Sequence, residues 1–155
     1  MVATADNGTI YNFRYRHGVD EKRRVQLPMK WRPLDPATEF TLTLWPKPEQ
    51  GPCLRVLPRS QFDKLLADIE ARPGTDPNKG FLKRYLGSWS TQVTLDKTGR
   101  ICIPEELAKK AGIEPNVEVM LVGLMNLIEI WSSDRFAKLS AVEDEQAPGA
   151  FQGLE

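Results

Sequence analysis

The chain contains an internal repeat, and a repeat constrains the possible folds more than any other feature of a sequence. Residues 20–28 (DEKRRVQLP) align with residues 96–104 (DKTGRICIP). In both copies Asp, Arg and Pro occupy the first, fifth and ninth places, and apolar residues occupy the sixth and eighth. Each copy is expected to form a charged turn followed by a short strand. The chain therefore predicts two similar β-rich units.

A helical segment separates the two units. From Ser60 onward, apolar residues recur at the three- and four-residue spacing of an amphipathic helix, and Ser60 with Asp63 is typical of a capping box. A second helical pattern follows a Pro- and Gly-containing break, and strand patterns then resume. We expect a loose N-terminal segment (1–11), a first unit (13–60), a helical insert (61–89), a second unit (90–133), and a C-terminal helix whose acidic tail is disordered beyond Ala141 (134–155).

An Asp and an Arg four residues apart across a tight turn can form an ion pair, and each repeat has one such pair. The carboxylate then holds the guanidinium in one orientation, so that the planar group can donate two hydrogen bonds to a guanine edge or a phosphate. The alternative is that the pair only stabilises the turn, where exposed ion pairs contribute about 1 kcal/mol or less. The occurrence of the pair in both repeats strengthens the binding interpretation, and both remain open at this point.

The charges are distributed unevenly along the chain. The formal net charge is zero, with 21 basic and 21 acidic residues, which excludes a uniformly basic nucleic-acid-binding surface. Residues 11–32, however, hold seven basic residues against two acidic ones, whereas residues 133–155 hold two against five. A basic β-ribbon can enter the major groove of DNA. The basic first unit is therefore compatible with DNA binding, and a merely solvated basic face is the alternative.

The sequence offers little for catalysis or metal binding. His17 is the only histidine, which excludes a multi-histidine metal site. The best catalytic arrangement combines His17 with Cys53 or Cys102, and neither sequence context favours an activated thiol. Phosphate-loop, dinucleotide and metal-binding motifs are missing from the sequence. We expect a protein that is not an enzyme and needs no cofactor or metal.

Cysteine content and hydropathy bear on the compartment. Two cysteines without CxxC spacing fit a reducing cytoplasm. The longest apolar stretch, Val119–Met125, is far shorter than the roughly 20 residues that span a bilayer, and the first ten residues do not resemble a signal peptide. A cytoplasmic protein without a membrane partner is expected.

Three segments together resemble the MraZ family of bacterial transcriptional regulators. They are the duplicated Asp-x-x-x-Arg pair, LDKTGRICIPEELAKKAGI and VMLVGLMNLIEIW, and the resemblance covers roughly residues 11–139. It implies an α+β fold of two tandem AbrB-like (SpoVT/AbrB) swapped-hairpin β units, packed as a pseudo-symmetric β barrel with a helical insert. It also implies a closed homo-oligomeric ring that associates with the nucleoid. The ring would bind short direct repeats in double-stranded promoter DNA, upstream of the division and cell-wall gene cluster, and repress it.

The resemblance also implies a set of DNA-contacting residues. The two arginines would meet base edges or phosphates, and the two aspartates would orient them. Cations in the same turns are expected, on physical grounds, to contact phosphates. The expected DNA-binding residues are Asp20, Lys22, Arg23, Arg24, Asp96, Lys97 and Arg100.

The first turn departs from the family pattern because Arg23 stands where the second copy has Gly99. Glycine reaches left-handed backbone angles freely, whereas Arg there costs about 1 kcal/mol or forces a different turn. The orientation of Arg24 depends on which of these occurs.

A second function class is a ring-forming structural or protein-interaction module without DNA readout. Two small β units of about 45 residues each can scarcely fill cores of their own. The aromatic residues and the apolar helix stripes are therefore expected to serve partly as core and partly as subunit contacts. Binding to a promoter fragment with tandem repeats would separate this class from the regulator.

Overall fold

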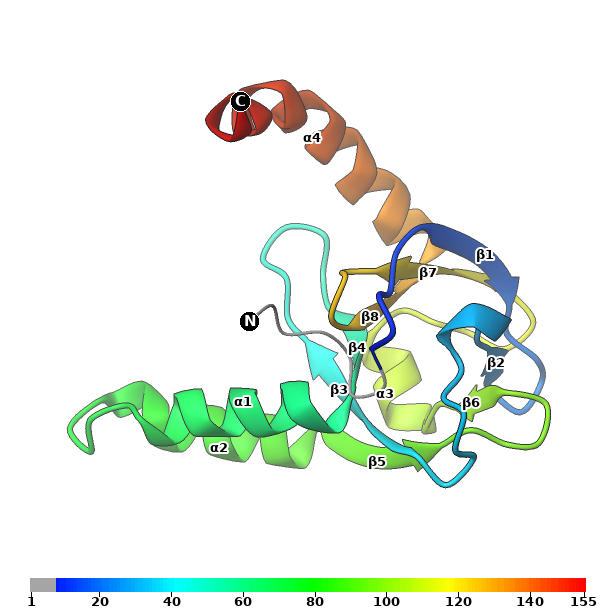
Figure 1. Ribbon diagram of the computed structural model, residues 1–155, viewed down its shortest axis with the longest axis horizontal. Coiled ribbons are helices and arrows are strands. Elements are labelled where there is room, and N and C mark those ends of the chain that lie inside the picture. Colours follow the sequence, from blue (N-terminus) through cyan, green and yellow to red (C-terminus); the bar gives the residue numbers. More distant parts are fainter. Residues whose placement is uncertain (1–7) are drawn as a thin grey trace.

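A six-stranded antiparallel sheet forms the body of the protein (Figure 1). The structure is a computed structural model that describes residues 8–155. Along the sheet the strands follow the order β1 (Arg14–Gly18), β7 (Glu118–Gly123), β8 (Ile128–Ser132), β4 (Cys53–Leu57), β3 (Glu39–Trp45) and β5 (Ser90–Thr94). Together with the helices, this sheet confirms the α+β class. Because β1 and β5 are the two edges and do not pair with each other, the expected closed barrel is not found in residues 8–155.

The strand order has an internal symmetry that follows the sequence repeat. Strands β1, β3 and β4 of the first half correspond to β5, β7 and β8 of the second. If each strand is exchanged for its counterpart, the order read from one edge of the sheet becomes the order read from the other edge. The first strand of each half therefore pairs with the other half: Tyr15 lies opposite Leu121, and Val93 lies opposite Phe40. The two halves are interleaved within one sheet.

A separate two-stranded ribbon joins the repeated segments themselves. It pairs β2 (Arg24–Gln26) with β6 (Arg100–Cys102) in antiparallel register, so that Val25 lies opposite Ile101. Both of these side chains are fully buried in the main core. Because successive side chains of a strand point to opposite faces, the residues on either side of Val25 and Ile101 face outward.

The main core lies between the six-stranded sheet, the ribbon and the helix α3 (Glu105–Lys110). Alternate residues of the inner strands point into it, as the period of two requires. Its largest fully buried members include Trp31, Phe40, Leu42, Leu54, Leu121, Ile128 and Ile130. A second, smaller cluster on the opposite face joins Cys53, Met120 and Trp131 to Phe136 of the last helix.

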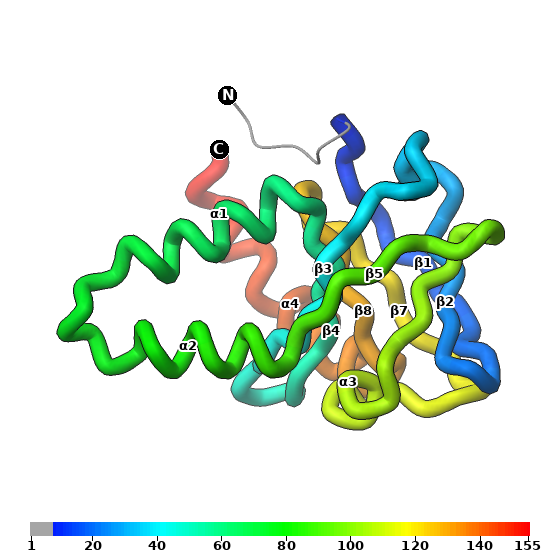
Figure 2. The backbone as a smooth tube through the Cα atoms, turned by 90° about the horizontal axis from the view of Figure 1, so that it is seen from below, coloured from blue at the N-terminus to red at the C-terminus, as the bar shows by residue number. Residues whose placement is uncertain are grey.

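Two helical projections leave this body (Figures 1 and 2). Helices α1 (Arg59–Glu70) and α2 (Pro77–Ser88) run side by side as an arm between β4 and β5, which places helices where the insert was expected. The predicted capping box is wrong: Pro58 is the N-cap, and Asp63 instead accepts a hydrogen bond from Arg59 Nε at 2.9 Å. The other projection is α4 (Ser133–Phe151), and two short 3-10 helices are η1 (Met29–Trp31) and η2 (Gln152–Leu154).

The chain beyond Ala141 is helical, so the expectation of a disordered tail is wrong. The Ser132 side chain caps α4 by accepting a hydrogen bond from Arg135 N, and Phe136 packs the first turn against the sheet. A helix nucleated in this way adds further turns at low cost, which the composition of the tail alone does not reveal.

The N-terminal segment differs in part from the loose one expected. Residues 1–7 lie outside the described residues. Tyr11, within the same segment, is buried and exchanges two backbone hydrogen bonds with Met125, at 2.8 and 2.7 Å. The aromatic ring of Tyr11 packs edge-on against Trp31.

Candidate nucleic-acid interface

The first repeat forms a tight turn organised by one carboxylate. Asp20 Oδ1 accepts hydrogen bonds from the backbone N–H of Lys22 at 2.9 Å and of Arg24 at 2.8 Å, while Oδ2 accepts from Arg24 Nε at 2.7 Å. The backbone closes the same turn through Arg23 N to Asp20 O at 3.0 Å. The side chain of Arg24 is thereby held by its Nε atom.

The second repeat forms the same turn. Asp96 Oδ1 accepts from the backbone N–H groups of Thr98 and Arg100, at 3.0 and 2.9 Å, and Oδ2 accepts from Arg100 Nε at 2.8 Å. The Thr98 hydroxyl adds a further hydrogen bond to Oδ1 at 3.0 Å. The Asp–Arg ion pair predicted from the sequence is thus present in both copies, with matching atoms.

These hydrogen bonds favour the ionised carboxylates. The pKa of Asp96 is lowered to about 2, and the backbone N–H of Arg100 is the largest cause. Desolvation opposes it, and hydrogen bonds from the Thr98 and Arg100 side chains and from the Thr98 N–H lower the pKa further. The backbone N–H of Arg24 is likewise the largest cause of the lowered pKa of Asp20. Both aspartates therefore remain anionic acceptors at any pH near neutrality.

Arg23 adopts the left-handed backbone of its counterpart. The φ angle is 60° at Arg23 and 82° at Gly99, so the arginine keeps the turn and does not force another one. The carbonyl groups of the two residues make equivalent hydrogen bonds, since Arg23 O accepts from Ile103 N and Gly99 O accepts from Leu27 N, each at 2.9 Å. Each turn is therefore tied to the strand end of the other repeat.

The two arginines lie on the same outward face of the β2–β6 ribbon. Val25 and Ile101 occupy the inner face, and Arg24, Gln26, Arg100 and Cys102 alternate with them on the outer one. About 31% of each arginine side chain is exposed. With Nε occupied by aspartate, the terminal nitrogens of Arg24 make no hydrogen bond to any described residue, so their donors are left for another acceptor.

The ribbon also brings the two repeats into direct electrostatic contact. Asp20 Oδ2 lies 3.7 Å from Arg100 Nη1, in addition to its hydrogen bond with Arg24. The two pairs are therefore one four-residue cluster with two positive and two negative charges.

The three other predicted cations have different surroundings. Lys22 and Lys97 are exposed at the tips of the two turns. Arg23 instead turns toward α3, where its Nη2 lies 3.6 Å from Glu105 Oε1. The predicted phosphate contact of Arg23 thus competes with an ion pair inside the chain.

Gln26 and Arg32 also belong to this surface and were not among the residues expected from the sequence. Gln26 donates from Nε2 to Thr98 O at 2.8 Å and bridges the two repeats beside Arg100. Its repeat counterpart, Cys102, lies 3.6 Å from Lys22 O. The sequence could have predicted Gln26, because it lies two residues after Arg24 and therefore on the same face of the strand. Arg32 donates to Leu27 O and covers Gly99. It lies outside the repeated segment, so the repeat could not have predicted its place.

His17, Cys53 and Cys102 lie on three different strands, β1, β4 and β6. Cys53 is buried in β4, where burial raises the pKa of its thiol, and His17 is in the edge strand β1. Within residues 8–155, no helix is both long and apolar enough to cross a membrane.

The family model that matches this chain and its similar proteins carry the same family name. A family model described as "MraZ protein, putative antitoxin-like" matches residues 88–149. Proteins named "Transcriptional regulator MraZ" are similar over most of their length. One from Halothermothrix orenii is 34% identical over 79% of this chain and 80% of its own. Another from Clostridium acetobutylicum is 33% identical over 80% and 82%, and one from Treponema pallidum is 32% identical over 79% and 78%.

The interleaved sheet and the paired Asp–Arg turns define a β-rich protein with a charged ribbon on its surface. Identity above 30% across about four-fifths of both chains then settles its relationship. The chain belongs to the MraZ family.

Proposed function

We propose that this protein is a DNA-binding transcriptional regulator. It acts as a repressor that binds short direct repeats in double-stranded DNA upstream of the division and cell-wall gene cluster. It works in the cytoplasm, at the nucleoid, as a closed homo-oligomeric ring. The relatives that carry the name of a transcriptional regulator support this assignment.

One observation carries the proposal. Arg24 and Arg100 lie on the outer face of a two-stranded ribbon, and each is held at Nε by the aspartate of its own turn. An antiparallel ribbon fits the width of the major groove. An arginine immobilised in this way presents its remaining donors to guanine O6 and N7 with little loss of side-chain entropy.

The other charged groups take supporting roles in this proposal. Lys22 and Lys97, at the exposed tips, contact phosphates on either side of the groove. Asp20 and Asp96 orient the arginines. Arg23 contributes to phosphate binding when it exchanges Glu105 for DNA.

The finer description of the fold belongs to the same proposal. Residues 13–60 and 90–133 form two AbrB-like swapped-hairpin units, with residues 61–89 inserted between them. The pairing of β1 with β7, β5 with β3, and β2 with β6 supports the exchange of strands between units. In the ring, several copies engage tandem repeats at once, which raises the overall affinity by a factor on the order of 10²–10⁴ where the spacings match.

The test compares two arginines with similar local partners. Arg100→Ala removes one base-reading group, whereas Arg59→Ala removes an exposed arginine of α1 that is also paired with an aspartate four residues away. Binding to a duplex with tandem direct repeats from the promoter is measured by fluorescence anisotropy, and native mass by light scattering. Arg100→Ala should weaken specific binding by about 5- to 150-fold at unchanged mass. Arg59→Ala should bind as the wild type does.

A salt titration distinguishes the phosphate contacts. Lys97→Ala should weaken binding to all sequences alike and reduce the slope of log K against log salt by about one. Normal operator binding by Arg100→Ala would overturn the role of Arg100. An intact ring without DNA binding in the wild type would instead favour the structural or protein-interaction module.

A further inference from the structure

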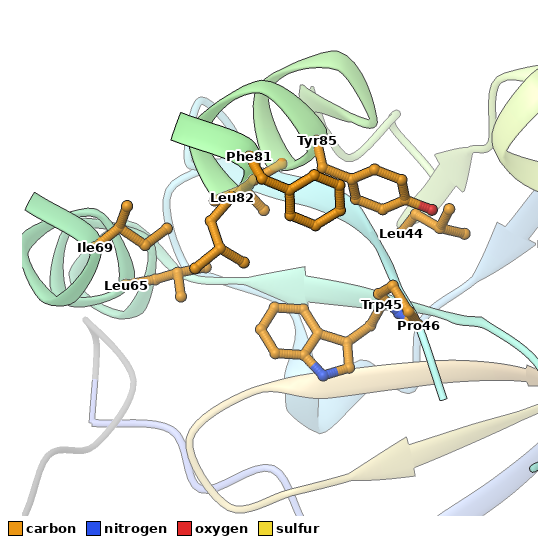
Figure 3. Close-up of a pocket in the computed structure, with 9 residues that line it drawn as sticks. Leu44, Trp45, Pro46, Leu65, Ile69, Phe81, Leu82 and Tyr85 are labelled. Atoms are coloured by element: carbon orange, nitrogen blue, oxygen red, sulfur yellow. The ribbon is translucent and has the colours of Figure 1, made fainter. Parts of the chain in front are cut away.

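An apolar groove lies at the base of the helical arm. It has a volume of about 500 Å³ and opens where the arm meets the end of β3 (Figure 3). Its walls are Leu65 and Ile69 of α1, Phe81, Leu82, Tyr85 and Leu86 of α2, and Leu44, Trp45 and Pro46 of the β3 end. Phe81 stacks on Tyr85 at 5.5 Å, yet 52% of it remains exposed. The groove is thus a preformed apolar surface that nothing in residues 8–155 covers.

The same chain carries a matching apolar element at the end of α4. Phe151 and Leu154 are 62% and 78% exposed, although the first turns of this helix are packed on the sheet. Phe151 ends α4, and Leu154 ends the 3-10 helix η2 that follows it; together with Ala147 they recur in the sequence at i, i+4 and i+7, the spacing of apolar anchors in helices that fit hydrophobic grooves.

The α2 wall of the groove and the end of the chain carry opposite charges. Helix α2 carries Lys79, Lys83 and Arg84 and no carboxylate. Residues 143–155 carry four carboxylates, at Glu143, Asp144, Glu145 and Glu155, and no cation. Lys83 is paired with Glu70 at 2.7 Å, and Lys79 Nζ donates to the backbone carbonyl of Glu70 at 3.0 Å; neither Lys79 nor Arg84 forms an ion pair with a carboxylate of residues 8–155. Helix α2 therefore carries two cations that no carboxylate of residues 8–155 neutralises by an ion pair.

The two surfaces cannot meet within one chain in this structure. Figure 1 shows α4 and the α1–α2 arm leaving the sheet in diverging directions, with the end of α4 well away from the arm. Two complementary surfaces at different places on one subunit form heterologous contacts, which build rings when the rotation closes.

We propose that the end of α4 of one copy docks in the α1–α2 groove of a second copy. Phe151 and Leu154 enter the groove, and the carboxylates of residues 143–155 face Lys79 and Arg84. This inference rests on the ring of the proposed function and specifies the contact that joins its subunits.

The first experiment removes the apolar anchors from the full-length chain. Phe151→Ala/Leu154→Ala is compared with Met29→Ala/Leu34→Ala, a control that trims two apolar residues that are at least as exposed elsewhere. Light scattering over a concentration series gives the native mass. The anchor variant should dissociate at about 10- to 100-fold higher concentration than the wild type. The control should keep the wild-type mass. Equal assembly by the anchor variant overturns the docking proposal.

The second experiment traps the contact covalently. In a Cys102→Ser background, which removes the exposed native thiol, one preparation carries Phe81→Cys and another Leu154→Cys. After mixing and mild oxidation, a disulfide-linked dimer of one chain of each kind is expected. Failure to form this dimer overturns the proposal, as does an intrachain disulfide in a dilute chain that carries both cysteines.

These outcomes separate the docking contact from DNA recognition. A monomeric wild type would overturn both the ring and the docking contact, whereas an unchanged mass of the anchor variant overturns the docking contact alone. Neither mass measurement tests the DNA-reading residues, whose assignment is tested separately by operator binding of the wild type and of Arg100→Ala.

Discussion

Asp20 and Arg100 belong to different repeats, yet the Asp20 carboxylate lies 3.7 Å from the Arg100 guanidinium. Asp20 is also hydrogen-bonded to Arg24 through the same oxygen, so one carboxylate contacts the arginines of both turns. This contact arises because β2 and β6 pair with each other. Each aspartate thus holds the arginine of its own turn, and Asp20 of the first turn also contacts Arg100 of the second.

Asp20→Asn should reduce specificity without reducing general affinity for DNA. The amide is a weaker acceptor for Arg24 and Arg100, so both lose orientation, while removal of a negative charge near the phosphates favours non-specific binding. The ratio of specific to non-specific binding constants should fall by about 5- to 150-fold. Competition titrations with operator and random duplexes measure this ratio. Asp63→Asn, in the exposed pair of α1, is the control, and a uniform loss on both duplexes would contradict the orienting role.

Arg23→Gly should stabilise the protein by about 1 kcal/mol. Arg23 holds a left-handed backbone, which glycine adopts without steric cost. The ion pair to Glu105 that is lost is long and half exposed, so it contributes little. Urea unfolding measures the free energy, and Glu105→Gln measures the ion pair separately. Gly99→Ala should have the opposite effect, because the new Cβ is strained and meets the Arg32 side chain. Destabilisation by Arg23→Gly would show that the side chain is needed for the turn.

Arg55→Met should destabilise the protein by about 3–5 kcal/mol. Arg55 Nε donates to Glu129 at 2.8 Å in the centre of the sheet, and the Glu129 side chain is only 5% exposed. Removal of the arginine leaves a buried carboxylate that keeps only neutral partners, Trp131 Nε1 and the Cys53 thiol. The double variant Arg55→Met/Glu129→Met should recover most of the loss in denaturant unfolding. As a control, the exposed pair formed by Arg59 and Asp63 should contribute less than 1 kcal/mol to the free energy of unfolding. If the double variant does not recover stability, packing and not charge accounts for the loss.

Acid should weaken the second turn only well below neutrality. The pKa of Asp96 is lowered to about 2 in the folded protein, against about 3.9 in an unfolded chain. A lowered folded pKa stabilises the protein above the unfolded value, and this contribution disappears as the pH falls from about 4 to about 2. Carboxyl carbon NMR gives the pKa directly. The stability difference between wild type and Asp96→Asn should be constant from pH 7 to 5 and shrink below pH 4. A normal Asp96 titration near pH 4 would contradict the hydrogen-bonded geometry.

The local elements were predictable because their signals are local. The Asp-x-x-x-Arg spacing correctly gave both turns and both ion pairs, since a carboxylate can reach the backbone N–H groups only within the next few residues. The two helices between the repeats also follow from the order of residues. The tail was misjudged because composition does not show that Phe136 docks and nucleates α4.

The order of amino acids alone determines the repeat, the two turns and the arginine that each turn holds, because these depend on contacts over four residues. The tertiary structure alone decided that the two turns lie on one ribbon, that Asp20 reaches Arg100, that Arg23 keeps the angle of Gly99, and that the sheet stays open. Such features depend on which distant strands pair. Many pairings satisfy the same alternation of apolar residues, and only the packing of the whole core selects one of them.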